Sequence, residues 1–493
     1  MGAEFLPKPS HNQNQDLSGD SDAAPVILGL LPAALVDHIA RVDSSILSTI
    51  PGEPGGSFPV AAEELKHILK EVDTHILSSA NDLSPLKTIA GGSVTNTIRG
   101  LATGFGISCG VVGACGDDEQ GSLFLKNMNL CGVNISRLRV KDEHTGQCVC
   151  LVDPLGNRTM RPCLATAAKI QAGELKREDF KGAKWLVMRY SIYNLEVISA
   201  AIRIAKQEGV LISLDLASFE MVRKFRAPLL QLLESGNVDL CFANEDEAAE
   251  LLSGEQAAHP EAALDVLGNY CQWAVVTLGA NGCIARHKKE VVRVPAVGQT
   301  NAIDATGAGD LFAGGFLYGL VKGMSLEECC IIGSCSGGSV IRSLGGEVSA
   351  ENWQWMYKQL KTNGLSAPAI VHDEVFQNSD LKKPSTTVDL GSESNTQFLL
   401  DIKQTNTVLE AQIKGTPALP APEAKGKEPL YLTDGQPSKA RKELFPAEST
   451  ATEDEQADAD VDTQSTGVKR KPDATQSNNP PKTILTSMLI LID

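Results

Sequence analysis

The chain has 493 residues, 42% of them hydrophobic, so it can build a large core as two or three domains or as one large domain with tails. Its formal net charge of -17 argues against a protein that binds nucleic acid. The only apolar run near either end, 484–492, is too short to span a bilayer, and the first residues lack a hydrophobic signal core. We therefore expect a soluble intracellular protein with neither a nucleic-acid nor a membrane partner.

Cysteine usage also indicates the compartment. All 12 cysteines lie between Cys109 and Cys335, several of them inside apolar runs, and none forms a CxxC pair or a Cys/His zinc spacing. This pattern is typical of buried free thiols in a reducing environment, so we expect a cytoplasmic protein. The short basic cluster Lys469–Pro472 leaves nuclear import open as an alternative, although such signals are commonly longer.

Residues 1–24 are polar and aperiodic and are predicted to be disordered, whereas residues 25–365 alternate between short apolar runs and segments with helical spacing of apolar residues. Such alternation is typical of a parallel sheet with helices on both faces, where ligands bind beyond the carboxyl ends of the strands. The predicted strands cover 26–31, 107–113, 185–188, 210–214, 238–243, 273–277 and 291–297, and the predicted helices include 61–77, 195–207, 248–252 and 326–340.

A small β insertion is predicted within this alternation. Residues 44–60 are rich in proline and glycine, which indicates a loop or the edge of a lid. Two strands, 148–152 and 158–161, flank the turn sequence Asp153–Asn157 and predict a hairpin. We place the lid elements at about 40–60 and 145–165.

The segment Asp304–Asp310, which reads DATGAGD, precedes a run with helical spacing of apolar residues. Gly307, Ala308 and Gly309 leave room for an anion beside main-chain N–H groups at a helix N-terminus. Asp310 would then be a carboxylate next to a bound phosphate, where it can act as a base toward an attacking hydroxyl. A small-residue turn capped by an aspartate is also a common purely structural feature.

This segment resembles the signature of the ribokinase-like (PfkB-type) family of sugar and nucleoside kinases, and the segment Ala90–Thr97 resembles that family's N-terminal signature. The resemblance covers roughly 25–365. It implies a three-layer, doubly wound, mostly parallel α/β sheet with a small β lid, and an enzyme that uses ATP and Mg²⁺. It also implies Asp310 as catalytic base, with Gly307, Ala308 and Gly309 around the transferred group and Thr306 near the nucleotide.

The resemblance implies an acceptor site as well. Its residues would be Asp37, following the first strand, and Gly91, Gly92 and Asn96. Asp37 alone also reads as a turn or cap residue, and paired glycines before a helix are common. Arg161, in the hairpin, either reaches the substrate or is an exposed lid arginine.

Further residues would bind nucleotide and metal. Asn244 and Glu247 match the family's magnesium-linked NxxE pattern, although a capping box at the start of a helix explains the same residues. The string TLGxxG assigns Thr277, Gly279 and Gly282 to the nucleotide phosphates. Asp304, together with the loop 344–347, would hold a monovalent cation such as K⁺.

We therefore expect ATP-dependent transfer of the γ-phosphoryl group to a hydroxyl of a sugar or nucleoside, by a monomer or a homodimer. The alternative is a catalytically silent family member that acts as a binding or regulatory scaffold. A phosphosugar kinase would need several basic side chains near Asp37, where the sequence offers only Arg41. Residues 366–493 are predicted to form a low-complexity, disordered tail without a catalytic role.

Overall fold

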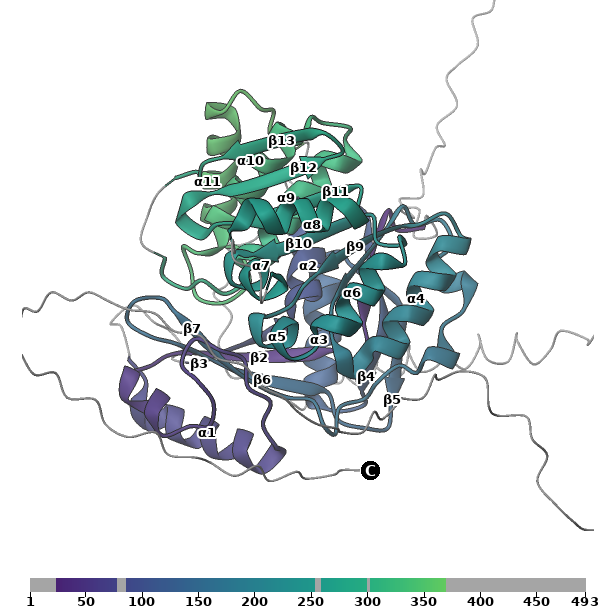
Figure 1. Ribbon diagram of the computed structural model, residues 1–493. Helices are drawn as coiled ribbons and strands as arrows, with labels where there is room; N and C mark the ends of the chain where they lie inside the picture. Colours follow the sequence, from purple (N-terminus) through teal and green to yellow (C-terminus); the bar gives the residue numbers. More distant parts are fainter. Residues whose placement is uncertain (1–23, 78–85, 253–258, 299–301, 369–493) are drawn as a thin grey trace, which may run out of the picture. The chain divides into compact units, whose positions relative to one another are not determined.

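The computed structural model describes residues 24–77, 86–252, 259–298 and 302–368, all within the unit Met1–Ile413. Figure 1 shows the arrangement of their helices and strands. The predicted disorder of residues 1–23 and 369–493, and the basic cluster Lys469–Pro472, lie outside the described residues. No helix in the described part of the chain is long and apolar enough to cross a bilayer.

A nine-stranded sheet, with the order β13-β12-β11-β10-β9-β8-β1-β4-β5, forms the centre of the fold. Strands β12 and β13 run antiparallel to their neighbours, and the other pairings are parallel. The mostly parallel sheet predicted from the sequence is therefore confirmed. The strand bounds are β1 Ile27–Leu31, β4 Cys109–Gly116, β5 Asn134–Lys141, β8 Trp185–Arg189, β9 Leu211–Asp215, β10 Leu240–Asn244, β11 Trp273–Thr277, β12 Cys283–His287 and β13 Glu290–Val294.

Side chains of each central strand alternate between two hydrophobic clusters, one on each face of the sheet. In β1, Ile27 and Leu31 belong to one cluster, whereas Leu28 and Leu30 belong to the other. Helices supply the outer half of each cluster, so the fold has the three layers expected. The first face is covered by α2 Ser93–Phe105, α3 Glu119–Leu130, α9 Ala308–Val321, α10 Leu326–Val340 and α11 Ala350–Thr362, and the second by α4 Leu195–Gln207, α5 Phe219–Lys224, α6 Arg226–Glu234, α7 Glu245–Leu251 and α8 Pro260–Tyr270.

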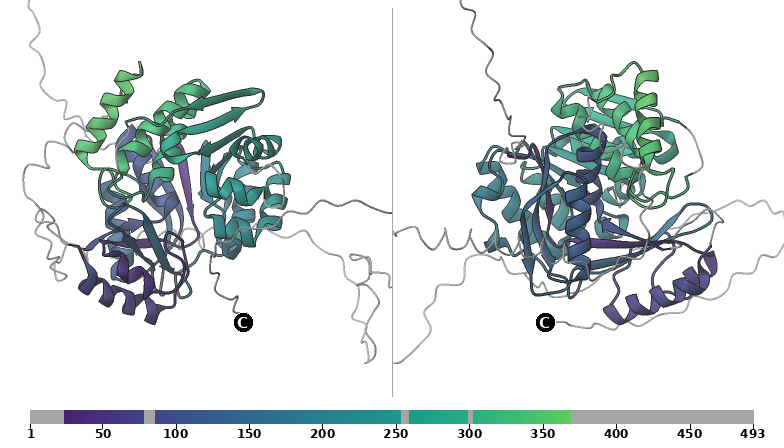
Figure 2. Two further views of the ribbon diagram at one scale, coloured as in Figure 1. Left: turned by 60° about the vertical axis from the view of Figure 1, so that its left-hand side comes forward. Right: turned by 180° about the vertical axis from the view of Figure 1, so that it is seen from behind.

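A separate four-stranded sheet, with the order β3-β2-β6-β7, forms the lid. Helix α1 (Ala62–His75) packs on one face of this sheet through Leu65, Ile68 and Val72, and Figure 2 shows it on the side away from the large sheet. The strands are β2 Leu35–Arg41, β3 Leu86–Gly91, β6 Gly146–Val152 and β7 Arg158–Cys163.

The lid agrees with the sequence predictions for its hairpin and its helix. The hairpin is β6–β7, and the helix expected at 61–77 is α1. Residues 44–60, expected as a loop or the edge of the lid, contain the short 3-10 helix Ser44–Ser48 and loops, and Ser57 forms an isolated β-bridge with Met160 of β7. The other half of the lid sheet is β2 and β3, because β2 pairs with both β3 and β6.

All twelve cysteines are free, and eleven of them are buried. The free buried thiols predicted from the sequence are therefore confirmed. Most of them fill space in the sheet strands and in helix α10 as small apolar side chains.

Candidate active site

The carboxyl ends of four adjacent strands place polar side chains side by side. Arg189, Asp215, Asn244 and Thr277 are the last residues of β8, β9, β10 and β11, and the sheet register pairs Arg189 with Asp215 and Asn244 with Thr277. All four line a cavity of about 760 Å³. The cavity thus occupies the sheet edge at which parallel α/β folds bind ligands.

The first turn of α9 forms one wall of this cavity. Gly307, with φ of 81°, caps the helix in a left-handed conformation, and a Cβ there would lie 2.9 Å from Cα of Gly346. The main-chain N–H groups of Gly309 and Asp310 have no hydrogen-bond partner among the described residues. Gly309 faces open space. These two amides and the positive end of the helix dipole form a place for an anion.

Ala308 behaves differently from its two neighbours. Its N–H donates to the carbonyl of Ala305 at 3.3 Å, and its side chain is not part of the cavity wall. The expected contribution of Ala308 is therefore limited to shaping the turn, while Thr306, Gly307, Gly309 and Asp310 all line the cavity.

Hydrogen bonds fix the Asp310 carboxylate against α2. Asn96 Nδ2 donates to Asp310 Oδ2 at 2.9 Å, and Thr97 Oγ1 donates to the Asp310 carbonyl at 3.1 Å. Asn96 is held in turn by Arg99, whose buried guanidinium donates to Asn96 Oδ1 at 3.0 Å and to the carbonyls of Ala90 and Gly346. No donor among the described residues reaches the other carboxylate oxygen, Oδ1, which remains available as a proton acceptor.

Asp37 approaches the same cavity from the lid. The sequence placed it just beyond the first strand; the structure places it inside β2, paired with Ile89 of β3 and Cys148 of β6, and only 4% exposed. A Cβ on Gly91 would lie 2.0 Å from Asp37 Cγ, so only glycine at position 91 leaves room for the carboxylate.

Burial raises the pKa of Asp37 to about 7. The N–H of Gly92 and the guanidinium of Arg99 oppose this rise in pKa, and the negative charges of Asp310 and Asp304 add to it. The charge of Asp310 therefore acts on Asp37, as expected for two acids that line one cavity.

Asn244 and Glu247 form a capping box and also line the cavity, and their link to magnesium stays a prediction. Asn244 N–H donates to Glu247 Oε2 and Glu247 N–H donates to Asn244 Oδ1, each at 2.8 Å, so the capping box at the start of α7 is confirmed. Both residues also line the cavity. Burial, and next the nearby charge of Asp215, raise the pKa of Glu247, while Arg189 and Arg158 oppose that rise. This cluster of oxygen atoms suits a hard divalent cation, which would neutralise the acids.

The loop after β9 is held in a strained conformation beside these acids. Ala217 has φ of 82°, which is unfavourable for a residue with a Cβ. Its N–H donates to Asp215 Oδ1 at 2.9 Å, and its carbonyl accepts from the guanidinium of Arg189. The two charged side chains therefore stabilise this turn at the cavity wall.

Of the three residues in the TLGxxG string, only Thr277 lines the cavity. Gly279 and Gly282, with φ of 53° and 88°, shape the turn between β11 and β12. A Cβ at Gly282 would lie 2.0 Å from the carbonyl oxygen of Val294. The structure thus gives both glycines a conformational role, and their contact with nucleotide stays a prediction.

Asp304 is fully buried and lies outside the cavity wall. Its oxygens accept from the N–H groups of Thr306 at 2.8 Å and Gly345 at 2.7 Å. Asp304 therefore connects the turn that precedes α9 to the loop 344–347, as the sequence suggested. A monovalent cation at this connection stays a prediction.

The hairpin arginines require a correction. Arg161 is 0% exposed, and its guanidinium donates to the carbonyls of Gly56, Met160 and Glu53. It is neither an exposed lid residue nor part of the cavity wall, because β7 turns it toward the loop that precedes α1. Arg158 lines the cavity instead, and its side chain has no hydrogen-bond partner among the described residues.

The cavity wall contains further residues that were not among the site residues named above. Arg189 and Asp215 end predicted strands, so their positions could have identified them. Tyr190 donates its hydroxyl to the Phe225 carbonyl at 2.9 Å, and Tyr193 is 66% exposed. Both aromatic residues line the cavity.

The fold and this cavity define a class of α/β proteins that bind a ligand at the carboxyl ends of parallel strands. A family model described as pfkB family carbohydrate kinase matches residues 69–353, more than half of the chain. The protein belongs to this family.

Individual relatives are consistent with this membership. The chain is 25% identical over 287 residues to a nucleoside kinase of Methanocaldococcus jannaschii, covering 56% of this chain and 86% of the relative. It is 27% identical over 281 residues to adenosine kinase 2 of Arabidopsis thaliana, covering 52% and 79%. It is also 28% identical over 260 residues to fructoselysine 6-kinase of Escherichia coli, covering 52% and 92%.

Two solved structures are similar over nearly their whole length. Adenosine kinase from Sinorhizobium meliloti has a TM-score of 0.59 at 28% identity, covering 67% of this chain and 98% of that one. A probable sugar kinase from Rhizobium etli has a TM-score of 0.60 at 27% identity, covering 69% and 98%. These similarities confirm the fold expected from the family resemblance.

Proposed function

We propose that this protein transfers the γ-phosphoryl group of ATP to a hydroxyl of a sugar or a nucleoside. One observation carries the proposal: the acceptor residues Asp37 and Asn96 and the phosphate turn of Gly309 and Asp310 line the same cavity of about 760 Å³. Relatives named as nucleoside, adenosine and fructoselysine kinases support both acceptor classes.

The acceptor end is organised by Asp37. An ionised carboxylate accepts two hydroxyl donors at once, which suits a vicinal diol. Gly91 and Gly92 bring the main chain close to this carboxylate without a side chain in between. The exposed ring of Tyr193 and the apolar side chains of Met160 and Met221 line the same wall and offer a surface for the remainder of the acceptor.

Asp310 is the proposed general base. Its Oδ2 is held by Asn96, so Oδ1 can take the proton from the acceptor hydroxyl as that oxygen attacks the γ-phosphorus. The unpaired amides of Gly309 and Asp310 would stabilise the negative charge on the transferring group. Base and amides belong to one helical turn, which fixes their relative position.

The nucleotide phosphates would lie along the carboxyl ends of β10 and β11. Thr277 and Thr306 offer hydroxyl groups there, and Arg158 offers a positive charge without a competing partner among the described residues. Mg²⁺, when bound, would neutralise phosphate charge, and Asn244, Glu247 and Asp215 are the residues placed to hold it directly or through water.

The test is a screen of sugars and nucleosides with Mg-ATP, in which both ADP and the phosphorylated acceptor are measured. We expect at least one acceptor to give equal amounts of the two products. Asp310→Asn should lower kcat for that acceptor by about 10²–10⁴-fold, the usual contribution of a general base. If no acceptor is phosphorylated, the alternative of a silent scaffold replaces this proposal. If Asp310→Asn is as active as the unmodified protein, Asp310 is not the general base.

A further inference from the structure

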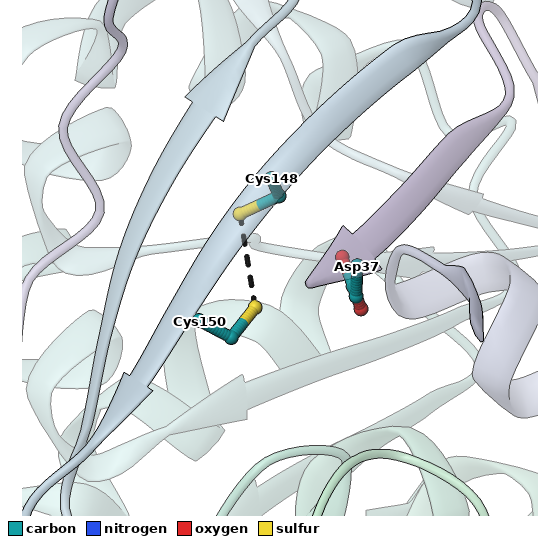
Figure 3. A group of neighbouring side chains, drawn as sticks. All are labelled: Asp37, Cys148 and Cys150. Carbon is teal, nitrogen blue, oxygen red and sulfur yellow. Dashed lines mark hydrogen bonds between the residues drawn. The ribbon is translucent and has the colours of Figure 1, made fainter. Parts of the chain in front are cut away.

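A pair of thiols lies directly behind the proposed acceptor carboxylate. Cys148 and Cys150 are two residues apart on β6, so both side chains project from the same face of the lid sheet. Their sulfur atoms are 3.8 Å apart, and Asp37 lies opposite Cys148 in the β2–β6 register. Figure 3 shows the two sulfur atoms facing each other, with the Asp37 side chain beside them.

The three side chains form a compact set of metal-binding atoms. One carboxylate oxygen and the two Sγ atoms all lie within 4.8 Å of one another, and all three residues are buried. No other group of three or more cysteine, histidine or acidic ligands is this close in the part of the chain that the structure describes. The structure therefore places two soft sulfur ligands and one hard carboxylate oxygen where a single ion could contact all three.

The spacing of the sulfur atoms agrees with tetrahedral coordination. A zinc ion binds thiolate sulfur at about 2.3 Å, which places two sulfur ligands of a tetrahedral site about 3.8 Å apart. Cys148 Sγ and Cys150 Sγ are already 3.8 Å apart. An ion can thus bind both without movement of the strand, and Asp37 would be the third protein ligand.

A disulfide fits the same pair less well. The S–S bond is about 2.05 Å long, and it requires Cα atoms that are typically about 5.5–6 Å apart. Residues two apart on an extended strand are separated by about 6.6 Å, near the upper end of the usual range of about 4.4–6.8 Å, and the two sulfur atoms would have to move from 3.8 Å to bonding distance. Coordination by an ion is therefore favoured over oxidation.

An ion can reach this position from the cavity. Asp37 and Cys148 both line the cavity wall, and Cys150 lies behind them. Three protein ligands leave one tetrahedral position open to water on the cavity side. The other neighbouring thiols, such as Cys241 with Cys271 and Cys283 with Cys330, do not line the cavity.

We propose that Asp37, Cys148 and Cys150 form a binding site for a thiophilic divalent cation such as Zn²⁺, and that the bound ion blocks the acceptor site. Binding converts both thiols to thiolates and releases two protons. The ion would occupy one of the two Asp37 oxygens that a vicinal diol needs, so ion and acceptor compete. This second part rests on the proposed kinase function; the ion site itself does not.

The test uses the full chain, kept reduced, and titrates it with Cd²⁺ while the ultraviolet thiolate-to-cadmium charge-transfer band is measured. Zn²⁺ is titrated separately by calorimetry in two buffers to count released protons. We expect one high-affinity ion per chain, with two protons released by the thiols and a further fraction by Asp37 where the pH leaves it protonated. Cys150→Ser should weaken binding by at least about tenfold, since even loss of an outer-sphere partner costs that much. Cys150→Ala, as a second variant, guards against misfolding, and unchanged thermal melting shows that each variant is folded.

Cys131→Ser is the matched control. Cys131 is the one cysteine that is not fully buried and lies outside the cluster, so it is the thiol most open to adventitious ions. Its replacement should leave the high-affinity band unchanged. If Cys150→Ser and Cys150→Ala bind Cd²⁺ like the unmodified protein, or if Cys131→Ser abolishes the band, the site is not the one proposed.

The activity measurement separates the two proposals. With an identified acceptor, Zn²⁺ should raise the acceptor KM without changing kcat. Cys150→Ser should remain active, and the Zn²⁺ concentration needed to raise its acceptor KM should be at least about tenfold higher. An ion site without any phosphorylated acceptor would contradict the kinase function alone. An active kinase whose Zn²⁺ inhibition is the same in Cys150→Ser would contradict the ion site alone.

Discussion

The two halves of the candidate site are built in different ways. The phosphate half is one helical turn, residues 306–310, in which neighbouring residues supply the amides and the base. The acceptor half combines a lid strand, a glycine pair and helix α2, and Arg99 connects them through hydrogen bonds to Ala90, Asn96 and Gly346. A local change should therefore disable the first half cleanly, whereas changes in the second half should also affect folding.

After Asp310→Asn, the largest expected effect is that of Gly309→Ala. A Cβ at this position meets no atom within 4 Å, so the methyl group fits the fold and projects into the cavity where the phosphoryl group would lie. Activity should fall by about 10²–10³-fold, the cost of losing anion stabilisation. The free energy of unfolding should rise by about 0.5–1 kcal/mol, because alanine is favoured over glycine in a helix.

Kinetics and urea unfolding of the same preparation check both parts of this prediction. An active Gly309→Ala variant would show that no ligand approaches this turn. A strongly destabilised variant would show that the turn is more tightly packed than the structure indicates.

Gly91→Ala is the matching change in the acceptor half. Here the new Cβ would lie 2.0 Å from Asp37 Cγ, so the carboxylate must move. The acceptor KM should rise by about 100-fold, equivalent to loss of charge-assisted hydrogen bonds worth about 1.5–3 kcal/mol. Unlike Gly309→Ala, this variant should also melt at a lower temperature. Calorimetry of the unfolding transition and acceptor titrations separate the two effects, and an unchanged KM would contradict the role of Asp37.

The difference between a site half built from one contiguous segment and one built from distant segments also explains what the sequence could predict. The phosphate turn, the parallel sheet and Asn244 with Glu247 lie in contiguous strings or at strand ends, where local pattern determines position. The lid strands β2 and β3 are defined by pairing between distant segments, so the sequence placed Asp37 just beyond the first strand and did not predict its strand. The choice between Arg158 and Arg161 depends on which face of β7 meets the cavity. A hairpin pattern gives the alternation of the two faces without saying which one is buried.

The two arginines of β7 provide the next comparison. Arg158→Ala should raise the KM for ATP by about ten- to thirtyfold, through loss of a charged contact, with no change in melting temperature. Arg161→Ala should lower stability by about 1–3 kcal/mol, because the carbonyls of Glu53 and Gly56 lose their buried donor. Initial rates and denaturant unfolding of both variants check this. The reverse pattern would restore the interpretation of Arg161 as a ligand-binding residue.

The smallest expected effect is a pH dependence of acceptor binding. Burial raises the pKa of Asp37 to about 7, so the carboxylate is ionised above that pH and protonated below it. Because the ionised form accepts hydroxyl donors, the acceptor KM should increase by about tenfold between about pH 8 and about pH 6. In Asp37→Asn the KM should be higher and independent of pH over this range. A KM that falls on acidification would contradict the assignment.

The central claim is tested most directly by measuring two quantities in Asp37→Asn and Asp310→Asn. One is the affinity for the acceptor, measured with a non-hydrolysable ATP analogue present, and the other is kcat. Asp37→Asn should weaken acceptor binding by at least about tenfold, since Asp37 holds the acceptor. Asp310→Asn should change the affinity for the acceptor by less than about threefold. It should nevertheless lower kcat by at least about 10²-fold, since Asp310 removes the proton from the acceptor hydroxyl. Acceptor binding that is unaffected by Asp37→Asn, together with normal turnover in Asp310→Asn, would contradict the account.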